Sequence, residues 1–457
     1  MAAASNITSG FVDIATYDQL ESGLYGGNGH TAYFKRETRK SNWFTIVPMV
    51  LSKANGTPGF NQDWAVHVSR AGDYLLNAWL RVTFPAVALT SGQAATYNLR
   101  WTKNLMHNLI EECSITFNDL VAARFDNYHL DFWAAFTTPA GKNNGYQNMI
   151  LNFEEVQTNP GSSIASFVGN LPLPLFFARD SGLALPTAAL PYNDIRIQFT
   201  FRDWSELLIK DLITGTPGTA TSAAVSATDL DGGAPVLGAT SVWATYAIVS
   251  NAERASMGCE ERDILIEQVQ TAPIQTFDPA NNTSPSYDIR FSHAVKALFF
   301  AVRNTTVASA WSNYTSASAY PATDGVSHNP TSGGDPIETM GLMYENTSRL
   351  SAMGADFYSL VQPWFHAPVI PAETGYHMYS YSLDFFCVDP MGSTNYGRLT
   401  NVSVTPTPSA DAIEGANGDG ADLASGTHWA QKYRFIVTAQ SNNVVRIHGG
   451  TLGFPIL

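Results

Sequence analysis

The segment Asp180-Ser181-Gly182 comes nearest in this chain to the nucleophile of a serine hydrolase. A serine that transfers an acyl group needs a histidine as general base, and the histidine needs a third group to orient it. His107 and His129 are the upstream candidates for that base, and neither stands in a protease-like sequence context. The segment therefore favours a tight turn between strands over a catalytic site.

Adjacent carboxylates could supply the acid and base of a glycoside hydrolase only if both groups reached one sugar bond. Successive side chains of a strand point to opposite faces of the sheet, so adjacent residues do not meet this condition. A pair formed by distant residues stays open. The adjacent pairs are Glu111-Glu112, Glu154-Glu155 and Glu260-Glu261. We expect no enzymatic activity and no catalytic residue.

Cofactor and metal patterns are equally weak. Gly26-Gly27-Asn28-Gly29 has neither the GxGxxG register nor the GK[S/T] ending of a phosphate loop, and it favours a flexible turn. Four polar residues of one Gly-rich loop could contact Ca²⁺, but their spacing departs from the EF-hand pattern. These are Glu414, Asn417, Asp419 and Asp422. The histidines lack paired ligand spacing, so we expect no metal and no cofactor.

Asn-x-Ser/Thr patterns are frequent, mostly in the second half of the chain. Such sites are modified in secreted proteins, and they are otherwise ordinary Asn- and Thr-rich turns. Because the chain starts without a secretion signal, we expect them to stay unmodified unless glycosylation occurs outside the secretory route. The candidates are Asn281, Asn282, Asn304, Asn313, Asn346 and Asn401, with further patterns at Asn6 and Asn55.

Composition and charge limit the class of protein. The 457 residues are 45% hydrophobic and only 14% charged, which is ample for large cores. The net charge of −14 would repel phosphate backbones, so nucleic acid is not expected as a direct partner. Cys113, Cys259 and Cys387 lie far apart without CxxC spacing, which favours free thiols in a reducing compartment. No apolar run is long enough to cross a bilayer, and the chain is expected to be cytosolic and soluble.

Strands must position most of these residues, because alternating apolar patterns dominate and helix signals are scarce. In Tyr74–Phe84, alternation places one face in the core, and Ile195–Phe201 alternates in the same way. The expected core positions of the first run are Leu76, Ala78, Leu80, Val82 and Phe84. Further strands are expected at Thr31–Phe34, Met378–Phe386 and Leu399–Val404. Residues 213–240 and 409–426 are expected to be surface loops, and a short helix is expected near Tyr17–Leu24.

The two halves of the chain repeat one pattern. A strand pattern at Cys113–Phe117 ends in Asn118-Asp119 and is followed by the aromatic cluster Tyr128–Trp133; Met340–Tyr344 ends in Glu345-Asn346 and is followed by a second aromatic cluster. Paired antiparallel sheets with long inserted loops suit a jelly roll in each half. A helix over residues 251–258, with an Asn cap and a Gly stop, is the expected junction.

Six ordered segments resemble the major capsid proteins of iridoviruses and, more loosely, of other large icosahedral DNA viruses. The resemblance covers nearly the whole chain and is weakest at residues 213–240 and 409–426. The segments are Tyr33–Arg36, Ala71–Leu76, Phe176–Gly182, Leu190–Asn193, Phe291–Lys296 and Pro390–Gly397.

This resemblance implies an all-β fold of two consecutive eight-stranded antiparallel jelly rolls (a double jelly roll) with long inserted loops and few short helices. The expected domains are an N-terminal arm (1–25), a first roll (26–250), a linker helix (251–262) and a second roll (263–457). The family further implies homotrimers that form capsomers of nearly hexagonal outline, contacts with neighbouring capsomers and with minor capsid proteins beneath the shell, and an inner membrane into which this chain does not insert. Assembly in the host cytoplasm and residence in the outer shell of the virion are expected.

A jelly-roll carbohydrate-binding protein or glycan-active enzyme is the alternative. It would use exposed aromatic rings to stack on sugars. Trp311, Tyr314 and Tyr320 are the candidates for those rings. The missing secretion signal and the extent of the resemblance both weigh against this alternative.

Overall fold

The computed structural model describes residues 2–153, 156, 161–213, 222–317, 333–417 and 430–454. The chain divides into two units, Met1–Trp43 and Phe44–Leu457. The first unit contains helix α1 (Ala2–Ala15) and helix α2 (Gln19–Leu24), which Asp18 and Glu21 cap reciprocally. Helix α2 matches the expected short helix, whereas the strand expected at Thr31–Phe34 does not form.

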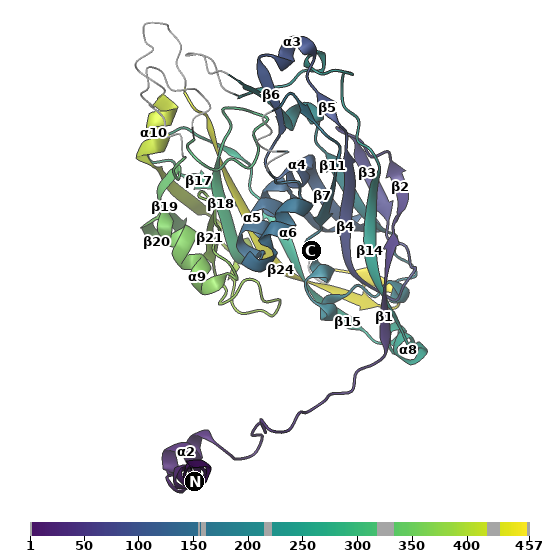
Figure 1. Ribbon diagram of the computed structural model, residues 1–457, viewed down its shortest axis with the longest axis vertical. Coiled ribbons are helices and arrows are strands. Elements are labelled where there is room, and N and C mark those ends of the chain that lie inside the picture. Colours follow the sequence, from purple (N-terminus) through teal and green to yellow (C-terminus); the bar gives the residue numbers. More distant parts are fainter. Residues whose placement is uncertain are drawn as a thin grey trace. The chain divides into compact units, whose positions relative to one another are not determined.

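The second unit contains two rolls, and each roll has two antiparallel sheets. In the first roll one sheet has the order β1-β14-β4-β10 and the other β2-β3-β11-β7-β8; in the second roll the orders are β15-β24-β18-β21 and β17-β23-β19-β20. Figure 1 shows the first roll in purple to teal and the second in green to yellow. The first-roll strands are β1 (Phe44–Val50), β2 (Ser52–Gly56), β3 (Asp63–His67), β4 (Tyr74–Phe84), β7 (Ile110–Phe117), β8 (Leu120–Asp126), β10 (Phe167–Pro172), β11 (Ile195–Phe201) and β14 (Thr240–Val249). The second-roll strands are β15 (Arg262–Thr271), β17 (Tyr287–Asp288), β18 (Ala294–Asn304), β19 (Ile337–Tyr344), β20 (Thr347–Gly354), β21 (His377–Ser380), β23 (Val402–Pro408) and β24 (Tyr433–His448).

Both rolls have the same connectivity. If β2 is set aside as an extra edge strand, each roll has eight strands, and the first, eighth, third and sixth in chain order form one sheet. The second, seventh, fourth and fifth form the other. This is the jelly-roll arrangement. The expected double jelly roll is therefore confirmed.

The remaining strands and helices are short. The strands are β5 (Val87–Ala88), β6 (Tyr97–Trp101), β9 (Ser163–Ile164), β12 (Leu208–Leu212), β13 (Ser222–Ala224), β16 (Gln275–Phe277), β22 (Thr394–Asn395) and β25 (Thr451–Gly453). The helices are α3 (Ser91–Ala94), α4 (Leu105–Leu109), α5 (Asn127–Thr137), α6 (Ala140–Met149), α8 (Asn251–Cys259), the π-helical turn η6 (Phe357–Val361), α9 (Gln362–His366) and α10 (Ala410–Asn417), together with short 3₁₀ turns.

The repeated sequence pattern corresponds to a repeated hairpin and helix. Asn118 and Asp119 connect β7 to β8 with φ values of 48° and 68°, and Glu345 and Asn346 connect β19 to β20 with φ values of 48° and 62°. Two successive left-handed residues are typical of the type I′ turn, whose twist matches that of the flanking strands. In each roll the hairpin leads into helix, α5 in the first and η6 with α9 in the second, and the aromatic clusters lie on these helices.

Core faces follow the expected alternation with one exception. Ile195, Ile197, Phe199 and Phe201 are all buried. In β4, Leu75 is buried and Leu76 is only half-buried, so the expectation for Leu76 is wrong. The pairing of β4 with β14 skips Leu76, since Thr245 pairs with Asn77 and Tyr246 with Leu75, so Leu76 is the extra residue of a β-bulge that shifts the alternation by one residue.

Several element boundaries differ from expectation. Strand β21 ends at Ser380 because Ser380 Oγ donates to the Ser382 carbonyl, and Asp384 accepts from the Phe386 amide, so local side-chain bonds replace sheet pairing. Strand β23 starts at Val402, not Leu399. Helix α8 forms as expected, but Ser250 is its N-cap residue and Gly258 lies within it. The two segments expected to be loops contain regular structure, since residues 213–240 include β13 and residues 409–426 include α10. Residues 214–221 and 418–429 of these segments lie outside the described residues.

Candidate functional site: the interface between the two rolls

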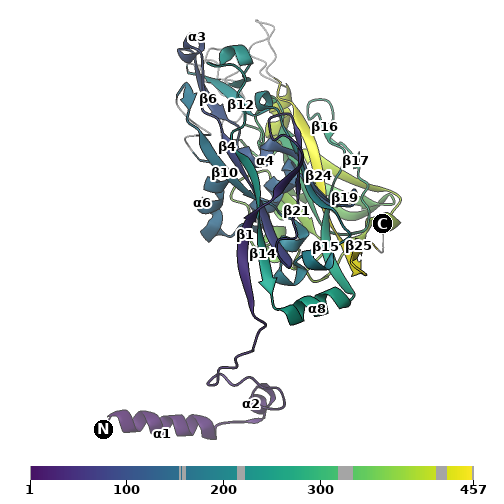
Figure 2. The same ribbon diagram turned by 90° about the vertical axis from the view of Figure 1, so that its right-hand side faces the viewer.

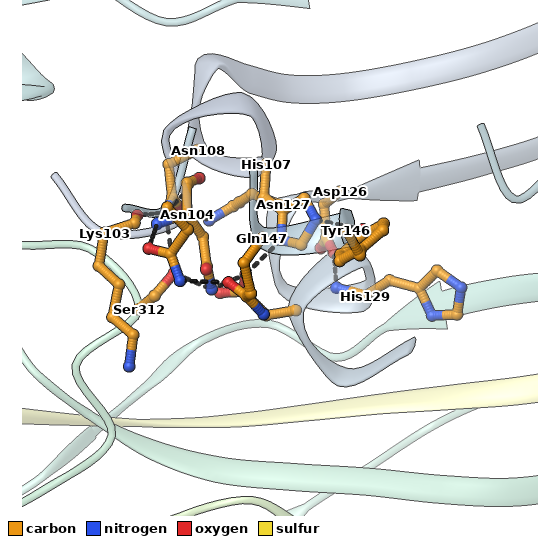
Figure 3. Close-up of polar contacts among 12 residues, drawn as sticks. Lys103, Asn104, His107, Asn108, Asp126, Asn127, His129, Tyr146, Gln147 and Ser312 are labelled. Atoms are coloured by element: carbon orange, nitrogen blue, oxygen red, sulfur yellow. Dashed lines mark hydrogen bonds and ion pairs between the residues drawn. The ribbon is translucent and has the colours of Figure 1, made fainter. Parts of the chain in front are cut away.

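A buried carboxylate joins the two rolls. Asp131 on α5 accepts hydrogen bonds from Asn104 Nδ2 (3.0 Å) and His107 Nδ1 (2.7 Å) of the first roll. It also accepts from Ser312 Oγ (2.6 Å) and Tyr314 OH (2.8 Å), which follow β18 of the second roll. Asp131 is 1% exposed, so solvent water does not compete with the four donors for its carboxylate oxygens. Figure 3 labels Asn104, His107 and Ser312 of this cluster, together with the neighbouring Tyr146. We call these five residues the inter-roll clasp.

The clasp has the composition of an acid–base site, but its geometry is that of a structural network. His107 uses both ring nitrogens, since Nε2 lies 2.6 Å from Tyr146 OH. Burial, followed by the charge of Asp131, raises the pKa of Tyr146, so the phenol stays protonated and is a poor nucleophile. A cavity of ≈ 190 Å³ adjoins His107 and Asp131. The four donors of the clasp nevertheless all bond to Asp131, which holds them in place.

Aromatic packing surrounds the clasp. Phe132 on α5 stacks on Phe299 of β18 with ring centroids 5.9 Å apart, and Phe136 lies 5.5 Å from the same ring. Trp133 packs on Phe385 and Phe386 beyond β21. The outer face of the sheet β15-β24-β18-β21 is therefore covered by the first roll, and its apolar residues belong to the same cluster as the first-roll core. In Figure 1, α5 and α6 lie between the two sets of strands.

A buried ion cluster lies at the same interface. Arg179 of the first roll pairs with Glu267 on β15 and contacts the Trp133 ring face, 4.4 Å from its centroid. Lys296 on β18 is fully buried and donates to Glu267 Oε1 at 2.6 Å. Burial lowers the pKa of Arg179, and the charge of Glu267 partly offsets that effect. Because Glu267 is shared by two cations, removing it would leave both without their carboxylate.

The residues considered for acyl transfer do not form a site. Ser181 lies in a short 3₁₀ turn, Ser181–Leu183, and His107 is held by the clasp. His129 is buried between Phe125 and Trp133, and desolvation lowers its pKa to about 3, so it is neutral at physiological pH. Neither histidine has a hydrogen bond to Ser181 among the described contacts.

The proposed sugar-stacking rings are not exposed. Trp311 is sandwiched between the guanidinium groups of Arg202 and Arg303, 3.7 and 3.5 Å from its ring centroid. Tyr314 is 2% exposed and belongs to the clasp. The expectation that these two rings face solvent is wrong, and Tyr320 lies outside the described residues.

The candidate asparagines differ in access. Asn304 is buried, and its side chain bonds to Gln431, Ala317 and Thr306, which leaves no room for a glycan. Asn281, Asn282 and Asn346 are exposed, while Asn313 and Asn401 are half-buried.

The remaining polar patterns also lack site geometry. Glu414 and Asn417 are exposed on α10, and Asp419 and Asp422 lie outside the described residues. Among the residues that the structure describes, no group of three or more His, Cys, Asp or Glu could hold a metal ion. In the same part of the chain, no helix is long and apolar enough to span a bilayer.

Comparison with known proteins identifies the family. The family model of the large eukaryotic DNA virus major capsid protein matches residues 253–453, and that of the major capsid protein N-terminus matches residues 32–249. The major capsid protein of Costelytra zealandica iridescent virus is 58% identical over 465 residues, which cover 100% of this chain and 99% of that protein. That of Frog virus 3 (isolate Goorha) is 44% identical, with 99% of each covered.

Solved structures agree on the fold. The PBCV-1 virus capsid has a TM-score of 0.72 at 19% identity, covering 93% of this chain and 100% of that chain. The Faustovirus major capsid protein has a TM-score of 0.71 at 13% identity, covering 92% and 93%. At these identities the two structures establish the double jelly roll alone, whereas the relatives above establish kinship over the full length. The chain belongs to the major capsid protein family of large eukaryotic DNA viruses, with iridovirus major capsid proteins as its relatives.

Proposed function

We propose that this chain builds the icosahedral shell as a homotrimer, in which six similar rolls give each capsomer a nearly hexagonal outline. It does so without catalysing a reaction. Proteins of this family form the capsid, and the trimer is the finer step proposed here. One observation carries it: the face that is covered in the second roll is open in the equivalent place of the first.

The open face belongs to the sheet β1-β14-β4-β10. A row of directly paired residues crosses it, and in this row Trp79 and Trp243 stack with centroids 6.1 Å apart. Ile46 and Phe44 lie on the same face further along β1, and both are more than half exposed. Figure 2 shows β1 and β14 side by side. The row consists of Pro172, Trp79, Trp243 and Val50. We call this surface the open face.

The element that would cover the open face is also present, and its large apolar side chains are exposed among the residues that the structure describes. In the first roll, α5 follows the hairpin and buries Phe132 and Phe136 against the second roll. In the equivalent helix of the second roll, η6 with α9, the exposed fractions of Trp364 and Phe365 are 72% and 70%. Leu360 and Val361 on the same helix are exposed as well. Large aromatic groups at this exposure are typical of interfaces.

These two surfaces fit a head-to-tail ring. If η6–α9 of one copy packs on the open face of the next, the contact between chains reproduces the contact between rolls within a chain. A heterologous contact of this kind closes into a ring when its rotation allows. Because the two rolls share one connectivity, three chains joined in this way would form a ring of six similar rolls.

The other parts of the proposal follow from the family. We propose domains at 1–25, 26–250, 251–262 and 263–457, minor capsid proteins as partners beneath the shell, an inner membrane enclosed by it, and assembly in the host cytoplasm. The net charge of −14 is consistent with a shell that does not bind the genome directly. We propose that the asparagine patterns stay unmodified.

Sedimentation velocity of the full chain tests the trimer. We expect wild type to sediment as a trimer at micromolar concentration, and Trp364→Asp with Phe365→Asp to sediment as a folded monomer. Val236→Ser is the matched control, because Val236 is equally exposed (74%) but lies outside both surfaces. Trp79→Ala with Trp243→Ala should weaken the trimer from the opposite side. A wild-type monomer, or variants that remain trimeric, would disprove the arrangement.

A further inference from the structure

One segment of the N-terminal unit carries a charge opposite to that of the rest of the chain. Residues 35–40 contain four cations and one acid, a net charge of +3, whereas the whole chain carries −14. The cations are Lys35, Arg36, Arg39 and Lys40. Residues 1–43 contain four cations and four acids and are neutral in sum, so the body from residue 44 onward carries all of the −14. This basic segment is therefore a local feature of the arm.

Solvent-exposed aromatic side chains flank the basic segment. Tyr33 and Phe34 precede it with exposures of 91% and 108%, and Trp43 follows it at 68%. No residue from 31 to 43 is buried within its unit. Aromatic rings next to cations are typical of segments that rest at the headgroup level of a bilayer, where the rings enter the interface and the cations meet phosphates.

Helix α1 adds a second apolar surface to the same unit. Ile7, Phe11 and Ile14 follow one another at spacings of four and three residues, so they share one face of the helix, and each is more than 60% exposed. Asp13 lies on the opposite side by helical periodicity. An amphipathic helix of this kind binds in the plane of a membrane surface rather than across it.

We propose that residues 1–43 bind the surface of a bilayer that contains anionic lipids. The cations of residues 35–40 contact the headgroups, while the face of α1 and the flanking aromatic rings enter the interface. An acidic protein would meet the cations equally well, but it would not account for an apolar helix face and three open rings in the same unit. The contact is peripheral, and it does not depend on the trimer.

Flotation of the full-length protein with lipid vesicles tests the proposal. We expect binding to vesicles of phosphatidylcholine with about a third phosphatidylserine, and much weaker binding to phosphatidylcholine alone. Lys35→Gln with Arg36→Gln should weaken binding roughly 25-fold, since each cation near an anionic surface contributes about fivefold. Ile7→Ser with Phe11→Ser should weaken binding to both vesicle types by at least about tenfold. Salt at about 0.5 M should reduce only the charge-dependent part.

The matched control removes two exposed cations of the body, Arg124→Gln with Lys142→Gln, and should leave flotation unchanged. Sedimentation of each variant establishes that it keeps the oligomeric state of wild type, so a failed trimer and a failed membrane contact are separable. Absence of wild-type flotation with either vesicle would overturn the proposal and leave an acidic protein as the partner of residues 35–40. Equal flotation of the arm and body variants would overturn it as well.

Discussion

Replacing Asp131 with alanine tests whether the inter-roll clasp stabilises the chain. The substitution leaves four donors without their acceptor, two from each roll. An unpartnered buried donor costs about 1–3 kcal/mol, and the cavity of ≈ 190 Å³ beside Asn104 and His107 can admit water that replaces part of the lost acceptor. We therefore expect the free energy of unfolding to fall by about 4–6 kcal/mol.

Graded variants separate charge from shape. Asp131→Asn keeps the side-chain volume but places an NH2 group, which cannot accept hydrogen bonds, opposite two of the donors. The free energy of unfolding should therefore fall by about 2–4 kcal/mol. Tyr314→Phe removes a single hydroxyl and should cost about 1–2 kcal/mol. Asp389→Ala, at an exposed aspartate, is the control and should change stability by less than about 0.5 kcal/mol.

Urea unfolding, followed by circular dichroism at one fixed protein concentration, measures these differences, because assembly would otherwise shift the apparent stability. A double-mutant cycle between Asp131→Ala and Tyr314→Phe should give a coupling of at least about 1 kcal/mol, since the two groups share one bond. A loss below about 1 kcal/mol for Asp131→Ala, or additive effects in the cycle, would refute the reasoning.

Four further outcomes are expected. The pKa of His129 is depressed to about 3 in the folded chain, so only the unfolded chain binds its proton between pH 6.5 and 3. The free energy of unfolding should therefore fall by about 2 kcal/mol from pH 6.5 to pH 5. Urea titrations at each pH measure this fall, and His129→Phe should remove the part of it that comes from His129. Gly375→Ala should lower the melting temperature by several degrees, because φ is +96° there and a Cβ would overlap the Tyr314 carbonyl oxygen. Intact mass spectrometry of protein from infected cells should show no glycan at Asn281 or Asn282, and a glycan mass would contradict this. Three copies carry −42, so static light scattering should show stronger association between capsomers as salt rises; flat scattering would count against charge repulsion.

Local signals in the sequence were sufficient for the framework of the fold. Asn118-Asp119 and Glu345-Asn346 stand where two successive left-handed residues are needed, and Cys113–Phe117 before the first of these turns alternates apolar and polar residues in sequence. Turn chemistry and alternation act over a few residues, so a single sequence carries them. Even here a bulge at Leu76 changed which side chain faces the core, because the pairing of β4 with β14 decides which residues of β4 point inward.

The clasp could not be found in this way. Ser312 and Tyr314 lie 181 and 183 positions from Asp131, and nothing in their local sequence distinguishes them from loop residues. Tyr314 and Trp311 were expected at the surface because aromatic residues in a Ser- and Asn-rich segment are typical of exposed loops. Their burial depends on the docking of one roll against the other, which is a tertiary property. Asp131 itself looked like a polar residue within an aromatic cluster, and only its four partners reveal its role.

The two helices that follow the hairpins suggest how one duplicated element serves two tasks. Helix α5 meets a partner on its own chain, at a high effective concentration, so its contact can include Asp131 and a polar network that fixes the docking geometry. In the proposed trimer, helix α9 meets a separate molecule and presents Trp364 and Phe365, whose burial of roughly 280 Å² would give about 7 kcal/mol before the cost of association. A charged network at that second contact would have to be desolvated anew in every assembly event. The division of polar and apolar residues between the two helices therefore fits one permanent interface within the chain and the proposed interface between chains.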